Sequence, residues 1–145
     1  MVEISPEALK IFSFWGSVLG LKVLAMLPLT AQQRFGKNIF MNEEDVRFLG
    51  RGKVVLNDPD VERVRKAHRN DLENILPWFM ITYLWLGTGP SPWLANTLIR
   101  TFVLARIIYT ISYVIIPQQP TRGFVFFLGF GITIYQALST LSYYS

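Results

Sequence analysis

After Glu73 the chain carries almost no charge: its last 72 residues hold only Arg100, Arg106 and Arg122 as Asp, Glu, Lys or Arg side chains. So few charges cannot cover a small water-soluble domain, in which about a quarter of the residues are charged. Over all 145 residues the charged share is 17% and the apolar share 51%. The sequence therefore predicts an integral membrane protein, and its length suits a single domain over residues 1–145.

Four stretches have the length and composition of membrane helices, for which about 20 mostly apolar residues suffice. We expect helices at about 6–33, 60–87, 93–116 and 121–143. Turns that contain proline separate the last three, and a polar loop at 34–59 separates the first two. The expected fold is all-α, an integral membrane four-helix bundle.

The basic residues favour one orientation of this bundle. The loop at 34–59 holds five Lys and Arg residues, whereas the turn at 87–92 holds none. Because cytosolic loops carry the excess of Lys and Arg, we expect the loop in the cytosol and both termini on the other side. This placement accounts for the net charge of +4 without nucleic acid, and no segment resembles a DNA-binding motif. With no cysteine, one histidine and no suitable carboxylate spacing, no metal site is expected.

One face of the second predicted helix carries a mixed set of polar groups. Arg63, Lys66, Asn70 and Glu73 are spaced by three and four residues, so they share a helix face. Two cations, an amide and a carboxylate suit a zwitterionic peptide, whose carboxylates and ammonium they would pair with. The alternative is an interfacial helix whose charges are solvated or pair with each other.

Arg106 and Lys22 are cations deep inside two of the predicted spans. Arg106 is near the middle of the third span, where exposure to lipid costs at least roughly 2.5 kcal/mol, so it must face the bundle interior or a polar cavity. It is either a ligand group or a structural residue held by backbone carbonyls or by Glu73. Lys22, deep in the first span, is expected to snorkel or to pair with Asp71 or Glu73.

Aromatic residues follow two of the arginines on the same helix faces. Tyr109 and Tyr113 come three and seven residues after Arg106, and Phe126 comes four residues after Arg122. Tyrosines in such a pattern are more often packing residues than catalysts. Arg122, at the start of the fourth helix, is either a topology anchor or a cation that stabilises a thiolate.

Several long motifs occur in the order of a known family. Residues 61–75 closely resemble the signature of the MAPEG family, the membrane-associated proteins of eicosanoid and glutathione metabolism. Residues 40–45 and 105–113 are similar to its loop and third-helix segments. Residues 117–122, followed by 126–131, are most similar to its glutathione transferase branch. The resemblance covers nearly the whole chain.

This resemblance implies a homotrimer in the endoplasmic reticulum membrane, with glutathione at the cytosolic end of each subunit interface. It implies Arg122 as the catalytic residue that stabilises the glutathione thiolate, and Arg34 as a residue that reaches glutathione from the neighbouring chain. The other positions that the resemblance assigns to the site, with Phe126 on its apolar side, are Lys66, His68, Arg69, Asn70, Glu73, Arg106, Tyr109, Tyr113 and Phe126.

The chain departs from the family pattern at four positions. Tyr109 stands where relatives carry histidine, so this chain lacks a titratable base there. Phe130 replaces a tyrosine, so a hydrogen-bond donor to glutathione is missing. Gly123 replaces the serine that follows the catalytic arginine in the prostaglandin E synthase branch. Val46 stands where the transferase branch has a stress-sensing cysteine. The glycine argues against an isomerase that needs the hydroxyl.

The expected activity is therefore attack of a glutathione thiolate on a hydrophobic electrophile, with reduction of lipid hydroperoxides as a second reaction. A prostaglandin E synthase-type isomerase and a non-catalytic membrane scaffold are the alternatives. The expected partners are glutathione, the apolar substrate, lipid and further copies of the chain. The preferred electrophile does not follow from the sequence.

Overall fold

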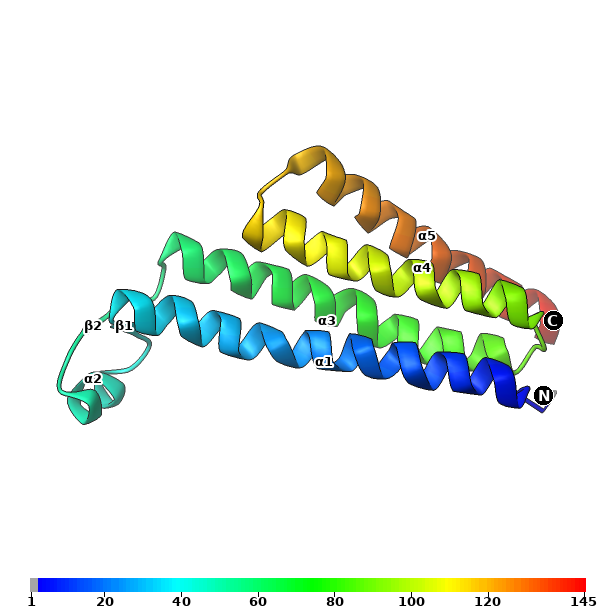
Figure 1. Ribbon diagram of the computed structural model, residues 1–145, viewed down its shortest axis with the longest axis horizontal. Coiled ribbons are helices and arrows are strands. Elements are labelled where there is room, and N and C mark those ends of the chain that lie inside the picture. The colour runs from blue at the N-terminus through cyan, green and yellow to red at the C-terminus, as the bar shows by residue number, and fades with distance from the viewer. Residues whose placement is uncertain (1–2) are drawn as a thin grey trace.

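The computed structural model describes residues 3–145 and is almost entirely helical. Four long helices lie side by side, α1 (Pro6–Lys37), α3 (Pro59–Leu86), α4 (Pro92–Thr110) and α5 (Gln119–Tyr144) (Figure 1). Helix α1 packs against both α3 and α4, and α5 packs against the same two helices. Both termini lie at one end of the bundle, and the α1–α3 connection lies at the other (Figure 1). We call these the terminal end and the loop end.

The α1 helix begins where capping chemistry places it and ends one turn later than expected. The Ser5 hydroxyl accepts a hydrogen bond from the Ala8 backbone N–H at 3.1 Å, and Pro6 takes the first helical position. The helix continues to Lys37 rather than to about residue 33, because the left-handed residue that ends it is Asn38, with φ 52°. The loop is correspondingly shorter at its start.

The polar loop contains short elements that the sequence did not predict. Strand β1 (Ile39–Phe40) pairs in parallel with β2 (Lys53–Val54), and helix α2 (Glu43–Leu49) lies between them. Gly52 closes this loop at φ 89°, and a Cβ there would lie 2.5 Å from the Asn38 carbonyl oxygen. Only glycine fits such an approach.

Helix α3 also starts at a strong cap. The Asp58 carboxylate accepts hydrogen bonds from the backbone N–H groups of Asp60 and Val61, each at 3.1 Å, and Pro59 follows it. Helix α4 continues as a π-helical segment, η1 (Ile111–Ile115), before the turn into α5. A π-helical segment is rare and is often found at functional sites.

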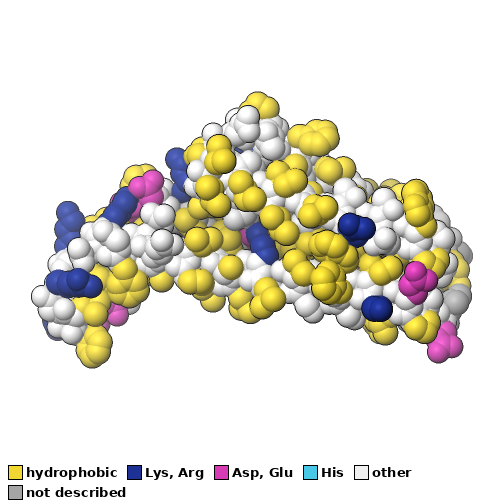
Figure 2. Space-filling model, in the orientation of Figure 1, with side chains coloured by type: hydrophobic (Ala, Val, Ile, Leu, Met, Phe, Trp, Pro, Cys, Tyr) yellow, Lys and Arg dark blue, Asp and Glu magenta, His cyan; other side chains and the backbone are white. Residues whose placement is uncertain are grey.

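The bundle core is mostly apolar in its terminal half, and the outer surface of the bundle is apolar too. Trp78 of α3 is completely buried and stacks on Phe102 of α4, with ring centroids 4.4 Å apart. Gly16 of α1 lets the ring of Phe79 approach, since a Cβ would lie 2.9 Å from it. Figure 2 shows hydrophobic side chains spread over the middle of the outer surface, where a soluble protein would be polar.

Three helical stretches are long and apolar enough to cross a membrane. They are α1, α4 together with η1 (Pro92–Ile115), and α5. Helix α3 is long enough, but its charged first half makes it less apolar than these three stretches. The structure therefore supports an all-helical membrane protein, while a fourth span through α3 stays a prediction.

Candidate functional site

A basic pocket opens at the loop end of the bundle. It has a volume of about 230 Å³ and is lined by Pro59, Arg63 and Lys66 of α3, Tyr113 of η1 and Arg122 of α5. The Arg122 guanidinium carbon lies 4.6 Å from the centre of the Tyr113 ring, a cation–π contact. Arg122 also donates a hydrogen bond to the Gln119 side chain one turn earlier. Three cations and no carboxylate among the lining residues make this a pocket for an anion.

The basic pocket brings together only part of the set expected from the sequence. Lys66, Tyr113 and Arg122 meet there, from three different elements, as the expected site requires. Arg63 joins them, although the family resemblance did not assign it. The helix face predicted from the sequence does include Arg63, so the spacing of three and four residues is the signal that identifies Arg63.

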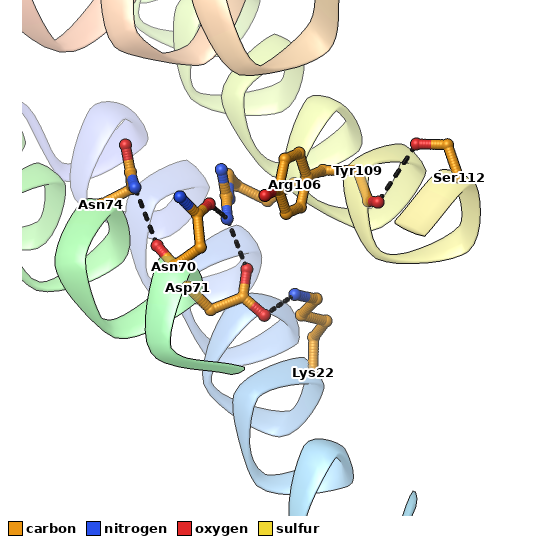
Figure 3. A network of polar contacts seen from close by, with 7 residues as sticks. All are labelled: Lys22, Asn70, Asp71, Asn74, Arg106, Tyr109 and Ser112. Atoms are coloured by element: carbon orange, nitrogen blue, oxygen red, sulfur yellow. Dashed lines mark hydrogen bonds and ion pairs between the residues drawn. The ribbon is translucent and has the colours of Figure 1, made fainter. Parts of the chain in front are cut away.

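Beneath this pocket, Arg106 belongs to a second group of polar residues, the central network. Its Nη2 donates to the Asn70 side-chain oxygen at 2.8 Å and to the Asp71 carboxylate at 2.6 Å (Figure 3). The other Asp71 oxygen pairs with the Lys22 ammonium of α1. Only 1% of Arg106 is exposed. The central network, Lys22, Asn70, Asp71 and Arg106, thus joins α1, α3 and α4 by ionic contacts within the bundle.

The network confirms one expectation and corrects another. Lys22 pairs with Asp71, as one of the two acids proposed for it. The acid that holds Arg106 is Asp71 and not Glu73, which is exposed on α3. The signal lay in the spacing: Asp71 falls in line with the buried stripe of Ala67, Ile75 and other apolar residues of α3, whereas Glu73 does not.

Aromatic rings connect the central network to the basic pocket. The Arg106 guanidinium lies 4.4 Å from the Tyr109 ring centre, and Tyr109 lies 5.7 Å from Tyr113, which in turn contacts Arg122. Phe126 of α5 closes the same cluster, 6.4 Å from Tyr109 between ring centres. Tyr109 and Phe126 pack together with buried apolar residues such as Val125. They lie next to Tyr113 but do not line the basic pocket.

Four of the expected residues lie elsewhere in the single chain. His68 is half-buried on α3, and Arg69 and Glu73 are exposed on it; none of the three lines the basic pocket. Arg34 lies near the end of α1, 9% exposed, beside a separate pocket of about 390 Å³ lined mainly by loop residues such as Phe40 and Phe48.

The guanidinium of Arg34 has unused donors. Among residues 3–145 its two terminal nitrogens, Nη1 and Nη2, are buried without a hydrogen-bond partner. Buried donors are normally paired, and a guanidinium strongly favours carboxylate partners. Arg34 therefore offers a second place for an anion, apart from the three cations of the basic pocket.

Comparison with known proteins gives a consistent result. The model of the MAPEG family matches residues 12–142. Microsomal glutathione S-transferase 1 of Mus musculus is 41% identical over 139 residues, which cover 93% of this chain and 90% of the relative. The human protein of the same name is 39% identical over the same length. Prostaglandin E synthase of Bos taurus is 34% identical over 122 residues, or 84% of this chain and 80% of that protein. The chain belongs to the MAPEG family.

Proposed function

We propose that this protein is a membrane-bound glutathione transferase that conjugates glutathione to hydrophobic electrophiles. The observation that carries the proposal is the basic pocket, in which Arg63, Lys66 and Arg122 gather beside an apolar bundle surface. Glutathione carries two carboxylates and becomes more anionic when its thiol ionises, so such a pocket favours the thiolate form. The names of the relatives, which are about 40% identical, support the same activity.

In this proposal Arg122 is the catalytic residue. A free thiol with a pKa near 8.5 is only a few per cent thiolate at neutral pH. The Arg122 guanidinium, near the N-terminus of α5, would stabilise the thiolate by a charge-assisted contact and by the positive helix end. The thiol proton leaves to water. The sulfur then bonds to the electrophilic carbon, and the leaving group departs with the electron pair of the bond that breaks.

The remaining ligand groups come from the predicted set. Lys66 and Asn70 of α3 offer a cation and an amide, and Glu73 offers a carboxylate for the ligand ammonium. His68, Arg69, Arg106, Tyr109, Tyr113 and Phe126 complete the proposed site. Since Arg69 and Glu73 are exposed and Arg34 lies in a separate pocket, one chain does not bring the whole set together.

A homotrimer accounts for that separation. An arginine at the end of α1 whose donors find no partner among the described residues suits a ligand held against a neighbouring subunit, and exposed residues of α3 suit a subunit interface. We propose that glutathione binds between two subunits, with Arg34 contributed across the interface. All four long helices would then cross the endoplasmic reticulum membrane, with the loop end and the charged start of α3 on the cytosolic side.

A second reaction of the same thiolate is reduction of lipid hydroperoxides. Two glutathione molecules would supply the electrons: one sulfur takes the distal oxygen, the alcohol leaves, and the second thiol displaces water to give the disulfide. The relative named prostaglandin E synthase favours an isomerase as the alternative function. Gly123, which follows Arg122 without a hydroxyl, weighs against that alternative.

The test uses the detergent-purified protein. Glutathione is added first, and formation of the thiolate is followed by its ultraviolet absorbance; an aryl halide is then added, and the conjugate is measured. Thiolate formation followed by conjugate supports the transferase. Binding without conjugate, together with isomerisation of an endoperoxide, would favour the isomerase. Absence of binding would leave a non-catalytic scaffold and contradict the proposal.

A further inference from the structure

The amide of Asn70 has its orientation imposed by the central network. Its Oδ1 accepts the hydrogen bond from Arg106 Nη2 at 2.8 Å, and a guanidinium offers donors only. If the amide were flipped, its NH₂ group would face another donor. The Nδ2 group must therefore point away from Arg106, as Figure 3 shows, and within residues 3–145 no hydrogen bond from it is formed. Asn70 thus presents a donor to its surroundings.

Arg106 keeps Asn70 in this orientation because Arg106 is itself fixed. Its Nη2 also donates to Asp71 Oδ1 at 2.6 Å, and it is almost fully buried. Asp71 is 0% exposed and shares its second oxygen with Lys22 of α1. Removing one partner of a buried ion pair leaves an uncompensated charge, so each member of this chain of contacts depends on the next.

The network is not balanced in charge. One carboxylate, Asp71, serves two cations, Lys22 and Arg106, and the structure places no second acid in contact with them among the described residues. The two cations come from α1 and α4 and the acid from α3, so Asp71 is the single acid on which both cations depend. Because Lys22 and Arg106 each engage one Asp71 oxygen, they hold the carboxylate in an orientation in which it accepts no hydrogen bond from Asn70 Nδ2 within residues 3–145.

We infer that Lys22 and Asp71 are positioning residues of the ligand site: through Arg106 they orient the Asn70 amide so that Nδ2 donates to an acceptor oxygen of the bound peptide. The acceptor is a carboxylate or peptide carbonyl oxygen, which glutathione has. This inference rests on the proposed function for the identity of the ligand. Neither Lys22 nor Asp71 touches the ligand in this account, and both act only through Arg106 and Asn70.

The first experiment tests the orientation of the amide by two changes at one residue. Asn70→Asp keeps an oxygen acceptor for Arg106 and removes the donor, whereas Asn70→Ala removes both. We expect both variants to raise the glutathione dissociation constant by about tenfold, the loss expected for one hydrogen bond. Asn70→Asp should retain the thermal stability of the unmodified protein. Binding by Asn70→Asp that equals that of the unmodified protein would overturn the inference.

The second experiment tests whether the support acts through Asn70. Asp71→Asn leaves two facing cations and can prevent folding, so the double variant Lys22→Met/Asp71→Asn is used, which removes one cation together with the acid. It should weaken glutathione binding by about tenfold, with kcat at saturating glutathione changed much less. Combined with Asn70→Ala it should add nothing further, because the same contact is already lost.

A matched control separates positioning from general stability. Thr82→Val removes a buried hydrogen bond to Gln136 at 2.9 Å, in the terminal half of the bundle. It should lower thermal stability and leave the dissociation constant unchanged. Additive effects of the Lys22/Asp71 and Asn70 changes would overturn the inference while leaving the proposed function intact. Absence of glutathione binding by the unmodified protein would overturn both.

Discussion

The two ends of this bundle are built from the same four helices but by different interactions. Towards the loop end, the bundle buries charged side chains, as in the contact between Asp71 and Arg106, and three cations line an open pocket. Towards the terminal end, the buried contacts include the stacked rings of Trp78 and Phe102 and a neutral hydrogen bond between Thr82 and Gln136. Charged contacts therefore predominate at the loop end, where the proposed site lies, whereas apolar packing predominates at the terminal end.

The largest expected effect tests the packed end. Trp78→Ala removes a completely buried ring together with its stacking contact to Phe102. Large-to-small changes of this kind cost about 4 kcal/mol of stability. Trp93→Ala, at an exposed position of α4, is the matched control. Unfolding in mixed detergent, followed by circular dichroism, measures the difference. The folded Trp78→Ala protein should still bind glutathione with its original affinity; a weakened affinity would contradict the division between the two ends.

The next effect tests the charged end. Arg122→Ala should lower the rate of conjugation to an aryl halide by about 100-fold, because a preorganised cation that stabilises the reacting anion is typically worth that much. The control Arg100→Ala removes a cation of α4 that lies over the Trp15 ring, 5.4 Å from the ring centre. That control should keep its conjugation rate. Equal losses in the two variants would show that only overall charge matters, and unchanged activity of Arg122→Ala would remove its catalytic role.

A smaller effect tests the neutral hydrogen bond. Thr82→Val leaves the Gln136 oxygen without its partner inside the bundle and should cost about 1 kcal/mol of stability. Thr97→Val is the control, since the Thr97 hydroxyl is exposed and bonds only to the Trp93 carbonyl of its own helix, at 2.8 Å. Thermal unfolding of the two variants in the same detergent compares them. If Thr97→Val lowered thermal stability as much as Thr82→Val, burial of the hydrogen bond would not determine its contribution to stability.

The smallest effect concerns pH at the loop end. The hydrogen bond from Lys37 holds the pKa of Asp58 below its ordinary value of 3.8, helped by the backbone N–H groups that it caps. A lowered folded-state pKa stabilises the protein above pH 3.8, and this contribution is lost as pH falls through the folded pKa. The protection factor for hydrogen exchange, which is corrected for the intrinsic pH dependence of exchange, should therefore fall in acid in the first turn of α3. It should fall less in Asp58→Asn, which keeps a capping oxygen without a charge.

The sequence predicted the features that depend on local chemistry. The expected helix starts at about residues 6 and 60 agree with the structure, where the Ser5 and Asp58 side chains cap α1 and α3 by bonding to nearby backbone groups. The helical, apolar character of the last 72 residues follows from the scarcity of charge. The pairing of Lys22 with Asp71 was one of two options, because a cation in an apolar span must find an acid within reach.

What the sequence did not predict depends on distant contacts. The parallel pairing of Ile39 with Lys53 joins residues from opposite ends of the loop, and no local pattern fixes which of them meet. The π-helical segment at Ile111–Ile115 has no propensity signal, since each of its residues also suits an ordinary helix. That Asp71 rather than Glu73 holds Arg106 is a different case, because the spacing of the buried residues of α3 does single out Asp71.

The apolar outer surface of α1 and α5 has a consequence for how the enzyme's kinetics must be expressed. A hydrophobic co-substrate that reaches these helices is dissolved in lipid or detergent, so its effective concentration is a mole fraction in that phase. Adding empty micelles at constant total substrate dilutes it, whereas glutathione, dissolved in water, is unaffected. The two substrates of the proposed reaction would then have Michaelis constants in two different units, one for each solvent that the protein meets.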